Sequence, residues 1–191
     1  MSRRDSILES AARVVAQRGI RGLRVEELAE AAGVSTSLIY YHFKDRAGLL
    51  AQTMEFISAR AERYTESEID AAADPVGHLE QLLLLELQDV PLVMENSTAW
   101  GESRATAVFQ PELRDQLCHA TARWSDHLRG LIRSAQERGT VPDTVVPADA
   151  AERLTALVEG LSMRWLSGSL ELARARELLR GAIPVELGTR S

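Results

Sequence analysis

Residues 29–50, AEAAGVSTSLIYYHFKDRAGLL, decide the fold, because they describe two short helices joined by a tight turn. Small and apolar residues recur at helical spacing over residues 25–32 and give the first helix a narrow face that a second helix can cross closely. Gly33 then supplies a positive φ, and Ser35 is a good N-cap for the helix that follows. The pattern predicts a helix-turn-helix.

The second helix of this pair, about residues 36–43, has two different sides. Ile39 and Phe43 lie four residues apart and can face a core. The opposite side begins with short polar residues, which can approach base edges in a major groove, and continues with longer side chains that can reach phosphates. The candidate DNA-contacting residues are Thr36, Ser37, Leu38, Tyr40, Tyr41, His42, Lys44 and Arg46. Tyr40 and His42 can instead pack against the other helices of a small N-terminal domain. A helix-turn-helix pattern of this kind also arises by chance in ordinary helical proteins.

This stretch resembles the N-terminal DNA-binding domain of the TetR family of transcriptional regulators, whose signature runs roughly A-G-V-S-x-G-x-[LI]-Y-x-[HY]-F-x-x-K-x-x-L-L. The matching residues are Ala32, Gly33, Val34, Ser35, Ile39, Tyr40, Tyr41 or His42, Phe43, Leu49 and Leu50. Ser37 stands where the family most often has Gly, which affects base preference or the approach of the backbone to DNA. Arg46 stands where the family most often has Lys, and it can still pair with a phosphate.

A helix over residues 6–18 precedes the pair, and Gly19 ends it. We expect it to complete a three-helix DNA-binding domain. Arg3 and Arg4 lie before this helix. They can touch phosphates from a flexible arm, or they merely make the start of the chain basic.

The charge of the chain is divided unevenly. The whole chain has a net charge of −6, with 22 basic and 28 acidic residues. Residues 1–50 hold eight basic and six acidic residues, a surplus of +2, which leaves −8 for residues 51–191. We therefore expect a basic head to meet DNA while an acidic body stays away from it, although charge alone does not identify a DNA-binding protein.

Several classes of protein are disfavoured by what the sequence lacks. The single cysteine, Cys118, and the absence of a signal peptide or of 18 consecutive apolar residues indicate a cytoplasmic protein without a membrane span. The four histidines show no metal-ligand spacing, so no metal site is expected, and no cofactor is expected either. No catalytic motif supports an enzyme.

The remainder of the chain is predicted to be helical. Helices are expected over residues 46–69, from 75 to before Pro91, and over 93–107, 112–138, 148–166 and 170–182. We therefore predict an all-α protein. It consists of a helix-turn-helix DNA-binding domain, residues 1–46, and a helical ligand-binding and dimerisation domain, residues 47–191.

An apolar stripe on the penultimate helix is the candidate dimer interface. In the TetR family the last two long helices pair with those of a second subunit, and the resemblance assigns this role to Leu154, Val158, Leu161 and Trp165. Gly160 and Ser162 would permit a close approach. The alternative is that the stripe faces only its own subunit.

Residues 100–165 also resemble, more loosely, the C-terminal domain of betaine-regulator-like members of the family. Helices in this part of family members surround an effector cavity, and the candidate lining residues are Met94, Trp100, Phe109, His119 and Trp124. Aromatic walls with a few polar groups suit a hydrophobic or cationic small molecule. Each of these residues can instead be an ordinary core residue, which is the more common role of Trp or Met at helical spacing.

The resemblance implies a homodimeric repressor that a small-molecule effector releases from its operator. Two recognition helices would enter successive major grooves about 34 Å apart on double-stranded DNA. The helix over residues 46–69 would transmit the change. Two alternatives remain open. One is an activator or regulator controlled by a protein partner, and the other is an all-helical enzyme or carrier whose N-terminal domain is only a vestigial interaction module.

Overall fold

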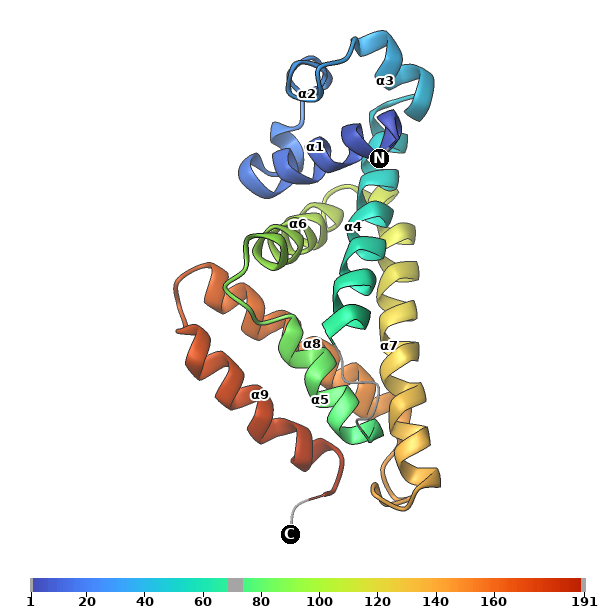
Figure 1. Cartoon of the computed structure of the whole chain (residues 1–191), viewed down its shortest axis with the longest axis vertical. Helices are drawn as coiled ribbons and strands as arrows, with labels where there is room; N and C mark the ends of the chain where they lie inside the picture. Colours follow the sequence, from blue (N-terminus) through green and yellow to red (C-terminus); the bar gives the residue numbers. More distant parts are fainter. Residues whose placement is uncertain (1, 69–73, 190–191) are drawn as a thin grey trace. The chain divides into compact units, whose positions relative to one another are not determined.

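The computed structural model describes residues 2–68 and 74–189, and within these ranges it contains helices and no strand (Figure 1). The α-helices are α1 (Arg3–Arg18), α2 (Val25–Ala32), α3 (Thr36–Phe43), α4 (Arg46–Glu68), α5 (Pro75–Leu85), α6 (Pro91–Ala107), α7 (Arg114–Glu137), α8 (Pro147–Leu166) and α9 (Leu172–Glu186). Two 3-10 turns, η1 (Ile20–Gly22) and η2 (Pro111–Leu113), lie between them. The prediction of an all-α fold is confirmed. None of the described helices has the length and apolar character that a membrane span requires.

The chain packs into two compact units, each with its own hydrophobic core. The first comprises Met1–Glu62 and Glu95–Ala120, and the second comprises Arg63–Met94 and Thr121–Ser191. The division therefore falls within α4, α6 and α7. The predicted DNA-binding domain, residues 1–46, is part of the first unit, and its boundary as a functional domain stays a prediction.

The core of the first unit extends from the three N-terminal helices into α4 and α6. Its largest buried side chains in the head include Ile7, Leu28 and Phe43, each at most 1% exposed. Leu49 and Ile57 of α4 and Ala99 of α6 join the same cluster. The small N-terminal helices are thus stabilised by apolar contacts with the helices that follow them in the same unit.

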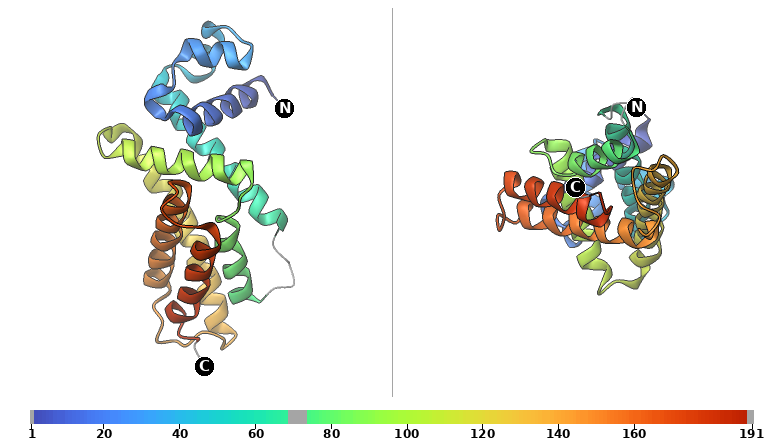
Figure 2. Two further views of the ribbon diagram at one scale, coloured as in Figure 1. Left: turned by 90° about the vertical axis from the view of Figure 1, so that its left-hand side faces the viewer. Right: turned by 90° about the horizontal axis from the view of Figure 1, so that it is seen from below.

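The core of the second unit is built from α5, α7, α8 and α9. The leucine-rich helix α5 supplies Leu79, Leu82 and Leu83, all at most 1% exposed, so this helix is central to the core of the unit. The helices α8 and α9 pack along each other, which Figure 2 shows as an orange and red pair. Helix α5 lies against α9.

The N-terminus of α1 differs from the sequence-based expectation. The helix begins at Arg3, because the Ser2 hydroxyl accepts the Asp5 N–H and the Asp5 carboxylate accepts the Ser2 N–H. This capping box places Arg3 and Arg4 in the first helical turn. The Arg4 guanidinium also donates to the side-chain oxygen of Gln52 on α4, at 2.6 Å. The prediction that Arg3 and Arg4 form a flexible arm is therefore wrong.

The last helix also differs in its bounds. The expected helix over residues 170–182 is found at Leu172–Glu186, and it contains Pro184 near its end. Proline disrupts a helix by removing a donor to the preceding turn, so it predicts a helix end. Here the helix continues for only two more residues. The expected end of the helix that follows Arg46, at Ile69, lies outside the described residues.

Candidate nucleic-acid interface

The turn between α2 and α3 is determined by local backbone chemistry. Gly33 adopts a left-handed conformation, φ 64° and ψ 39°, and the N–H of Val34 donates to the Ala29 carbonyl at 2.9 Å. Ser35 then caps α3, because its hydroxyl accepts the Leu38 N–H at 3.2 Å. These contacts reverse the chain within a few residues and confirm the predicted helix-turn-helix.

Helix α3 has one buried and one exposed side. Ile39 and Phe43 are each 1% exposed and belong to the core of the first unit. On the other side Tyr41 is 81% exposed and Tyr40 is 46% exposed. The other candidate contacts on this helix comprise exposed Ser37 and half-buried Thr36, Leu38 and His42. The helix thus presents hydroxyl, phenol and imidazole groups while its apolar pair holds it in place.

The end of α3 is a tight turn that presents Lys44. This residue has φ 63°, and within the described part of the chain no other residue except glycine has a positive φ. The Asp45 carboxylate accepts the Gly48 N–H at 2.7 Å, and any β-carbon on Gly48 would collide with the Phe43 carbonyl oxygen. A positive φ costs a lysine about 1–3 kcal/mol, so the structure holds Lys44 in a strained and exposed position.

Arg46, the last candidate contact, already donates to backbone carbonyls. One terminal nitrogen of its guanidinium lies 2.6 Å from the Ile20 oxygen, and its Nε lies 3.3 Å from the Leu23 oxygen. The N–H of Ile20 in turn donates to the carboxylate of Glu102 on α6, at 3.1 Å. Arg46 of α4 therefore binds the carbonyl groups of Ile20 and Leu23, at the start of η1 and just after it, while Glu102 of α6 binds the N–H of Ile20. A phosphate contact by Arg46 stays a prediction.

Comparison with known proteins decides the family. A model of the N-terminal domain of bacterial regulatory proteins of the tetR family matches residues 7–53, which contain α2, α3 and the turn between them. A model of the C-terminal domain of BetI-type transcriptional repressors matches residues 75–188, which is more than half of the chain. The chain belongs to the TetR family. It is a TetR-family transcriptional regulator with a helix-turn-helix DNA-binding domain.

Individual relatives agree over nearly the whole length. A TetR-family transcriptional regulator from a Rhodococcus species is 46% identical, with a TM-score of 0.92 over 97% of this chain and 98% of that one. A transcriptional regulator from Saccharomonospora viridis, solved in complex with choline, is 28% identical, with a TM-score of 0.83 over 94% of each chain. The regulator BetI of Pseudomonas fluorescens is 28% identical over 88% of this chain and 82% of that protein.

These relatives are regulators and not enzymes, so the alternative of an all-helical enzyme or carrier is set aside for this TetR-family regulator.

The five candidate effector residues of this TetR-family regulator lie in different environments. Trp100 is half-buried against the first core, with the Arg104 guanidinium 5.3 Å from its ring centroid. Phe109 is 74% exposed, and His119 is also exposed. Met94 and Trp124 belong to the second unit, where both are half-buried. A common role in one effector pocket stays a prediction.

The candidate dimer residues of α8 lie on its inner side. Leu154 is fully buried, and Val158 and Leu161 are each 4% exposed, in the core of their own unit. Trp165 is half-buried and packs against that core. Leu154, Val158 and Leu161 are therefore covered by their own subunit, whereas Trp165 is only partly covered, and a role of this stripe in a dimer stays a prediction. The alternative, that the stripe faces its own subunit, agrees with the burial of Leu154, Val158 and Leu161 in this unit.

One polar cluster in the first unit was not foreseen. The Arg60 guanidinium on α4 donates to the side-chain oxygens of Glu95 and Asn96 on α6, each at 2.8 Å, and lies over the ring of Phe56. Asn96 is 1% exposed, and its Nδ2 atom is a buried donor with no partner in the described part of the chain. The residues are 35 or 36 positions apart, so no local pattern in the sequence could have identified the cluster.

Proposed function

We propose that this protein is a homodimeric repressor that a small-molecule effector releases from its operator. The observation that carries the proposal is the outer side of α3, where Tyr40, Tyr41 and Lys44 stand exposed over the buried pair Ile39 and Phe43. The match of residues 75–188 to BetI-type repressors supports repression rather than activation.

The exposed side of α3 suggests how the residues divide their work on DNA. Thr36, Ser37 and Leu38 lie in the first turn, the part of a recognition helix that contacts base edges. Tyr40, Tyr41, His42 and Lys44 lie further along and would contact phosphates. Arg46 would support them by holding η1, whether or not it also contacts a phosphate.

The outer sides of α8 and α9 support association of two copies. Ala156, Gly160 and Gly181 are exposed, and a β-carbon on either glycine would meet nothing within 4 Å in the single chain. Glycine inside a helix costs about 1 kcal/mol relative to alanine, so two such glycines on adjacent helices favour a close approach by another helix. We therefore place the dimer interface on this outer side rather than on the buried stripe.

The polar cluster between α4 and α6 supports an effector site in the first unit. The unpartnered Nδ2 of Asn96 calls for an acceptor, since a buried donor without a hydrogen bond costs about 1–3 kcal/mol. Phe56 and Trp100 of the same unit offer aromatic surface nearby in the core cluster. An effector with an oxygen acceptor and an apolar or cationic portion fits both features. Choline, which the Saccharomonospora viridis relative binds, is the first probe to use.

Selection of bound sequences from a random DNA pool tests the DNA-binding part. We expect a near-palindromic site bound by a dimer. A Lys44→Ala change should weaken binding to all sequences, and it should lower by about 1 the slope of the logarithm of the binding constant against the logarithm of the salt concentration. A Ser37→Gly change should alter which sites are preferred. A monomer that binds the selected site at full strength would contradict the proposal.

The effector part is tested with the selected site. Choline and related small cations with an oxygen acceptor should release the dimer from DNA, and an Asn96→Leu change should raise the concentration required by about tenfold. Asn96→Leu removes the unpartnered donor and also the oxygen that accepts from Arg60, so retention of the fold is checked by the melting temperature. If release is unaffected by the change, the effector does not contact Asn96.

A protein partner is the second candidate for control of the regulator. Val108 and Phe109 follow α6 directly and are 64% and 74% exposed, an apolar pair that a partner could cover. A Phe109→Ser variant that keeps its response to a small molecule but loses regulation in cells would favour this alternative. A variant unchanged in both would exclude it.

A further inference from the structure

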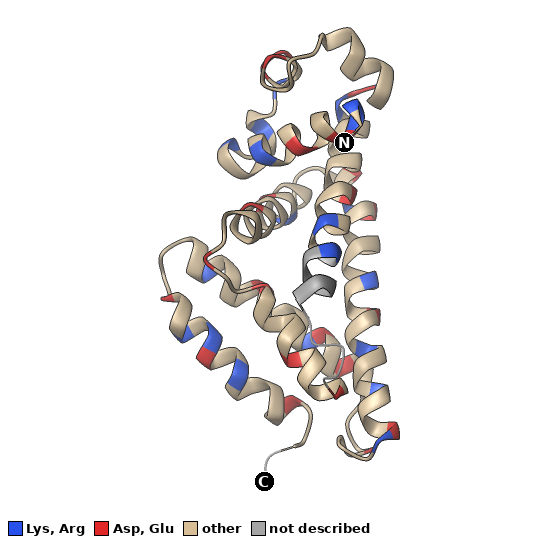
Figure 3. Cartoon of the chain, in the orientation of Figure 1, with Lys and Arg blue, Asp and Glu red and all other residues tan. Residues whose placement is uncertain are grey.

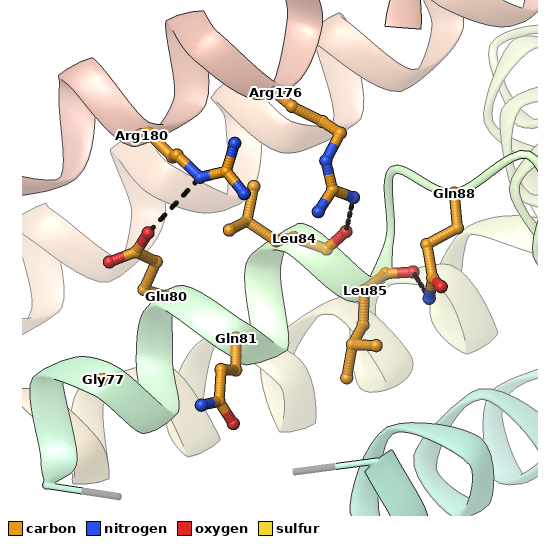
Figure 4. Close-up of a pocket in the computed structure, with 8 residues that line it drawn as sticks. All are labelled: Gly77, Glu80, Gln81, Leu84, Leu85, Gln88, Arg176 and Arg180. Atoms are coloured by element: carbon orange, nitrogen blue, oxygen red, sulfur yellow. Dashed lines mark hydrogen bonds and ion pairs between the residues drawn. The ribbon is translucent and has the colours of Figure 1, made fainter. Parts of the chain in front are cut away.

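A second candidate ligand site lies in the second unit, between α5 and α9. It is a groove with a volume of about 520 Å³. Figure 4 shows its lining residues Glu80, Gln81, Leu84 and Leu85 on α5 and Arg176 and Arg180 on α9. Neither Trp124 nor any other candidate effector residue lines it. The groove is therefore separate from the proposed effector site.

The two arginines are one helical turn apart, and each is only partly engaged by the protein. One terminal nitrogen of Arg176 donates to the carbonyls of Leu84 and Leu87, at 3.0 and 2.6 Å, where α5 ends. The Nε of Arg180 lies 3.6 Å from the Glu80 carboxylate, a long ion pair between half-exposed groups. The other terminal nitrogen of Arg176 and both of Arg180 have no partner in the described part of the chain.

The charges in the groove do not balance. Arg176 and Arg180 face the single carboxylate of Glu80. Burial lowers the pKa of Arg176, and the neighbouring charge of Arg180 lowers that pKa further. Two guanidinium groups one turn apart on α9 repel each other, and together they form a favourable place for an anion. Basic residues recur along α9 in Figure 3, and of these Arg176 and Arg180 line the groove.

Helical spacing separates the groove from the proposed dimer face. Arg176 and Arg180 lie on the side of α9 that faces α5, whereas Gly181 and Val185 lie toward the other side. The groove would therefore stay open when two copies associate through the outer sides of α8 and α9.

We propose that this groove binds the oxyanion of a small organic acid, a carboxylate or a phosphate. The two guanidinium groups bind the oxyanion with their unpartnered N–H groups, since guanidinium matches the planar geometry of both anions. The apolar part of the ligand lies along Leu84 and Leu85. A simple cation such as choline is excluded from this groove by its net positive charge.

Calorimetric titration of the full chain, without DNA and at constant ionic strength, tests the proposal. The probes are octanoate, hexyl phosphate, octanol and choline. We expect octanoate or hexyl phosphate to bind, and the probe that binds more tightly shows whether the groove prefers a carboxylate or a phosphate. Octanol and choline should not compete with either. Binding of octanol as tightly as octanoate would overturn the proposal, because the apolar part alone would then suffice.

A matched pair of variants on α9 locates the site. Arg180→Gln removes a guanidinium from the groove and should weaken octanoate or hexyl phosphate binding by about tenfold. Arg174→Gln is the control, because Arg174 also forms an ion pair, with Glu177 at 2.8 Å, but does not line the groove. Equal losses in both variants would show a general charge effect and would overturn the proposal.

A gain of affinity provides a test that loss of folding cannot imitate. Glu80→Gln removes the only carboxylate that competes for Arg180 in the groove, so it should tighten binding of the same probe several-fold. Unchanged or weaker binding by this variant would contradict the assignment of the groove. None of these measurements depends on operator release, so the groove and the proposed function fail independently.

Discussion

The outer sides of α3 and of the α8–α9 pair differ at the positions that the two proposed contacts use. Helix α3 presents Tyr40, Tyr41 and Lys44, which extend far from the backbone. Helices α8 and α9 present Gly160 and Gly181, which extend hardly at all. A recognition helix reaches phosphates with long polar side chains, whereas a helix that packs against another helix needs room for the two backbones to approach.

The two regions are alike behind these surfaces. Ile39 and Phe43 anchor α3, and Leu154 and Val158 anchor α8, all nearly or fully buried. Each outer side can therefore be changed without altering the core that supports it. The following substitutions test that separation.

Replacing Gly160 with leucine should disrupt the dimer most strongly. The new side chain would appear twice in a two-fold interface, and overpacking costs about 1–3 kcal/mol at each copy, so the dissociation constant should rise by about 100-fold. Sedimentation equilibrium measures the change. Gly130→Leu on α7 is the control, since Gly130 is also exposed with no atom near its missing β-carbon. Unchanged association of Gly160→Leu would remove the proposed interface.

Replacing Phe43 with alanine should destabilise the head without touching its outer side. A buried phenylalanine truncated to alanine costs about 3–5 kcal/mol, measured by urea unfolding at fixed protein concentration. Tyr41→Ala, at a site 81% exposed, should leave the unfolding free energy almost unchanged and weaken operator binding. A large loss of stability in Tyr41→Ala would show that the two sides of α3 are not independent.

Replacing Lys44 with glycine should raise stability and lower DNA affinity. Glycine accepts the positive φ at this position, so relief of strain should stabilise the fold by about 1 kcal/mol, while loss of the ammonium group removes a phosphate contact. Lys44→Ala keeps the strain and loses the charge, so it should match the glycine variant in binding but not in melting temperature. Equal melting temperatures would mean that the turn is not strained.

The smallest effect concerns pH and the second unit. Burial, and then the nearby charge of His127, lowers the pKa of His78 below its usual 6.5, and the two rings lie 6.0 Å apart. The unfolded chain therefore binds a proton more readily, so stability is fully present above about pH 6.5 and is lost as the pH falls toward the lowered value. His78→Gln should flatten this decline in thermal melts between pH 7 and 5.5. A decline as steep as in the parent protein would assign it to other groups.

Local signals explain what could be predicted from the sequence. Gly33 and Ser35 act on N–H and C=O groups within five residues of themselves, so the helix-turn-helix follows from the residues between α2 and α3. The capping box of Ser2 and Asp5 is equally local, and it places Arg3 and Arg4 in a helical turn where a flexible arm was expected.

Tertiary pairing explains what could not be predicted. The periodicity of Leu154, Val158 and Leu161 correctly indicates that one side of α8 is buried, but it does not say which chain buries it. Arg46 fits a phosphate contact until the carbonyls of Ile20 and Leu23 are seen beside it. In both cases the residue types are informative, and the identity of their neighbours requires the fold.

Lys44 is the only lysine among 191 residues, since the other 21 basic residues are arginines. Reagents directed at side-chain amines therefore meet a single lysine, and it stands exposed at the end of α3. A fluorophore attached there reports on operator binding from one known position. For the same reason, acylation of one nitrogen atom would remove the only side-chain ammonium group of the chain, and with it the phosphate contact proposed for Lys44.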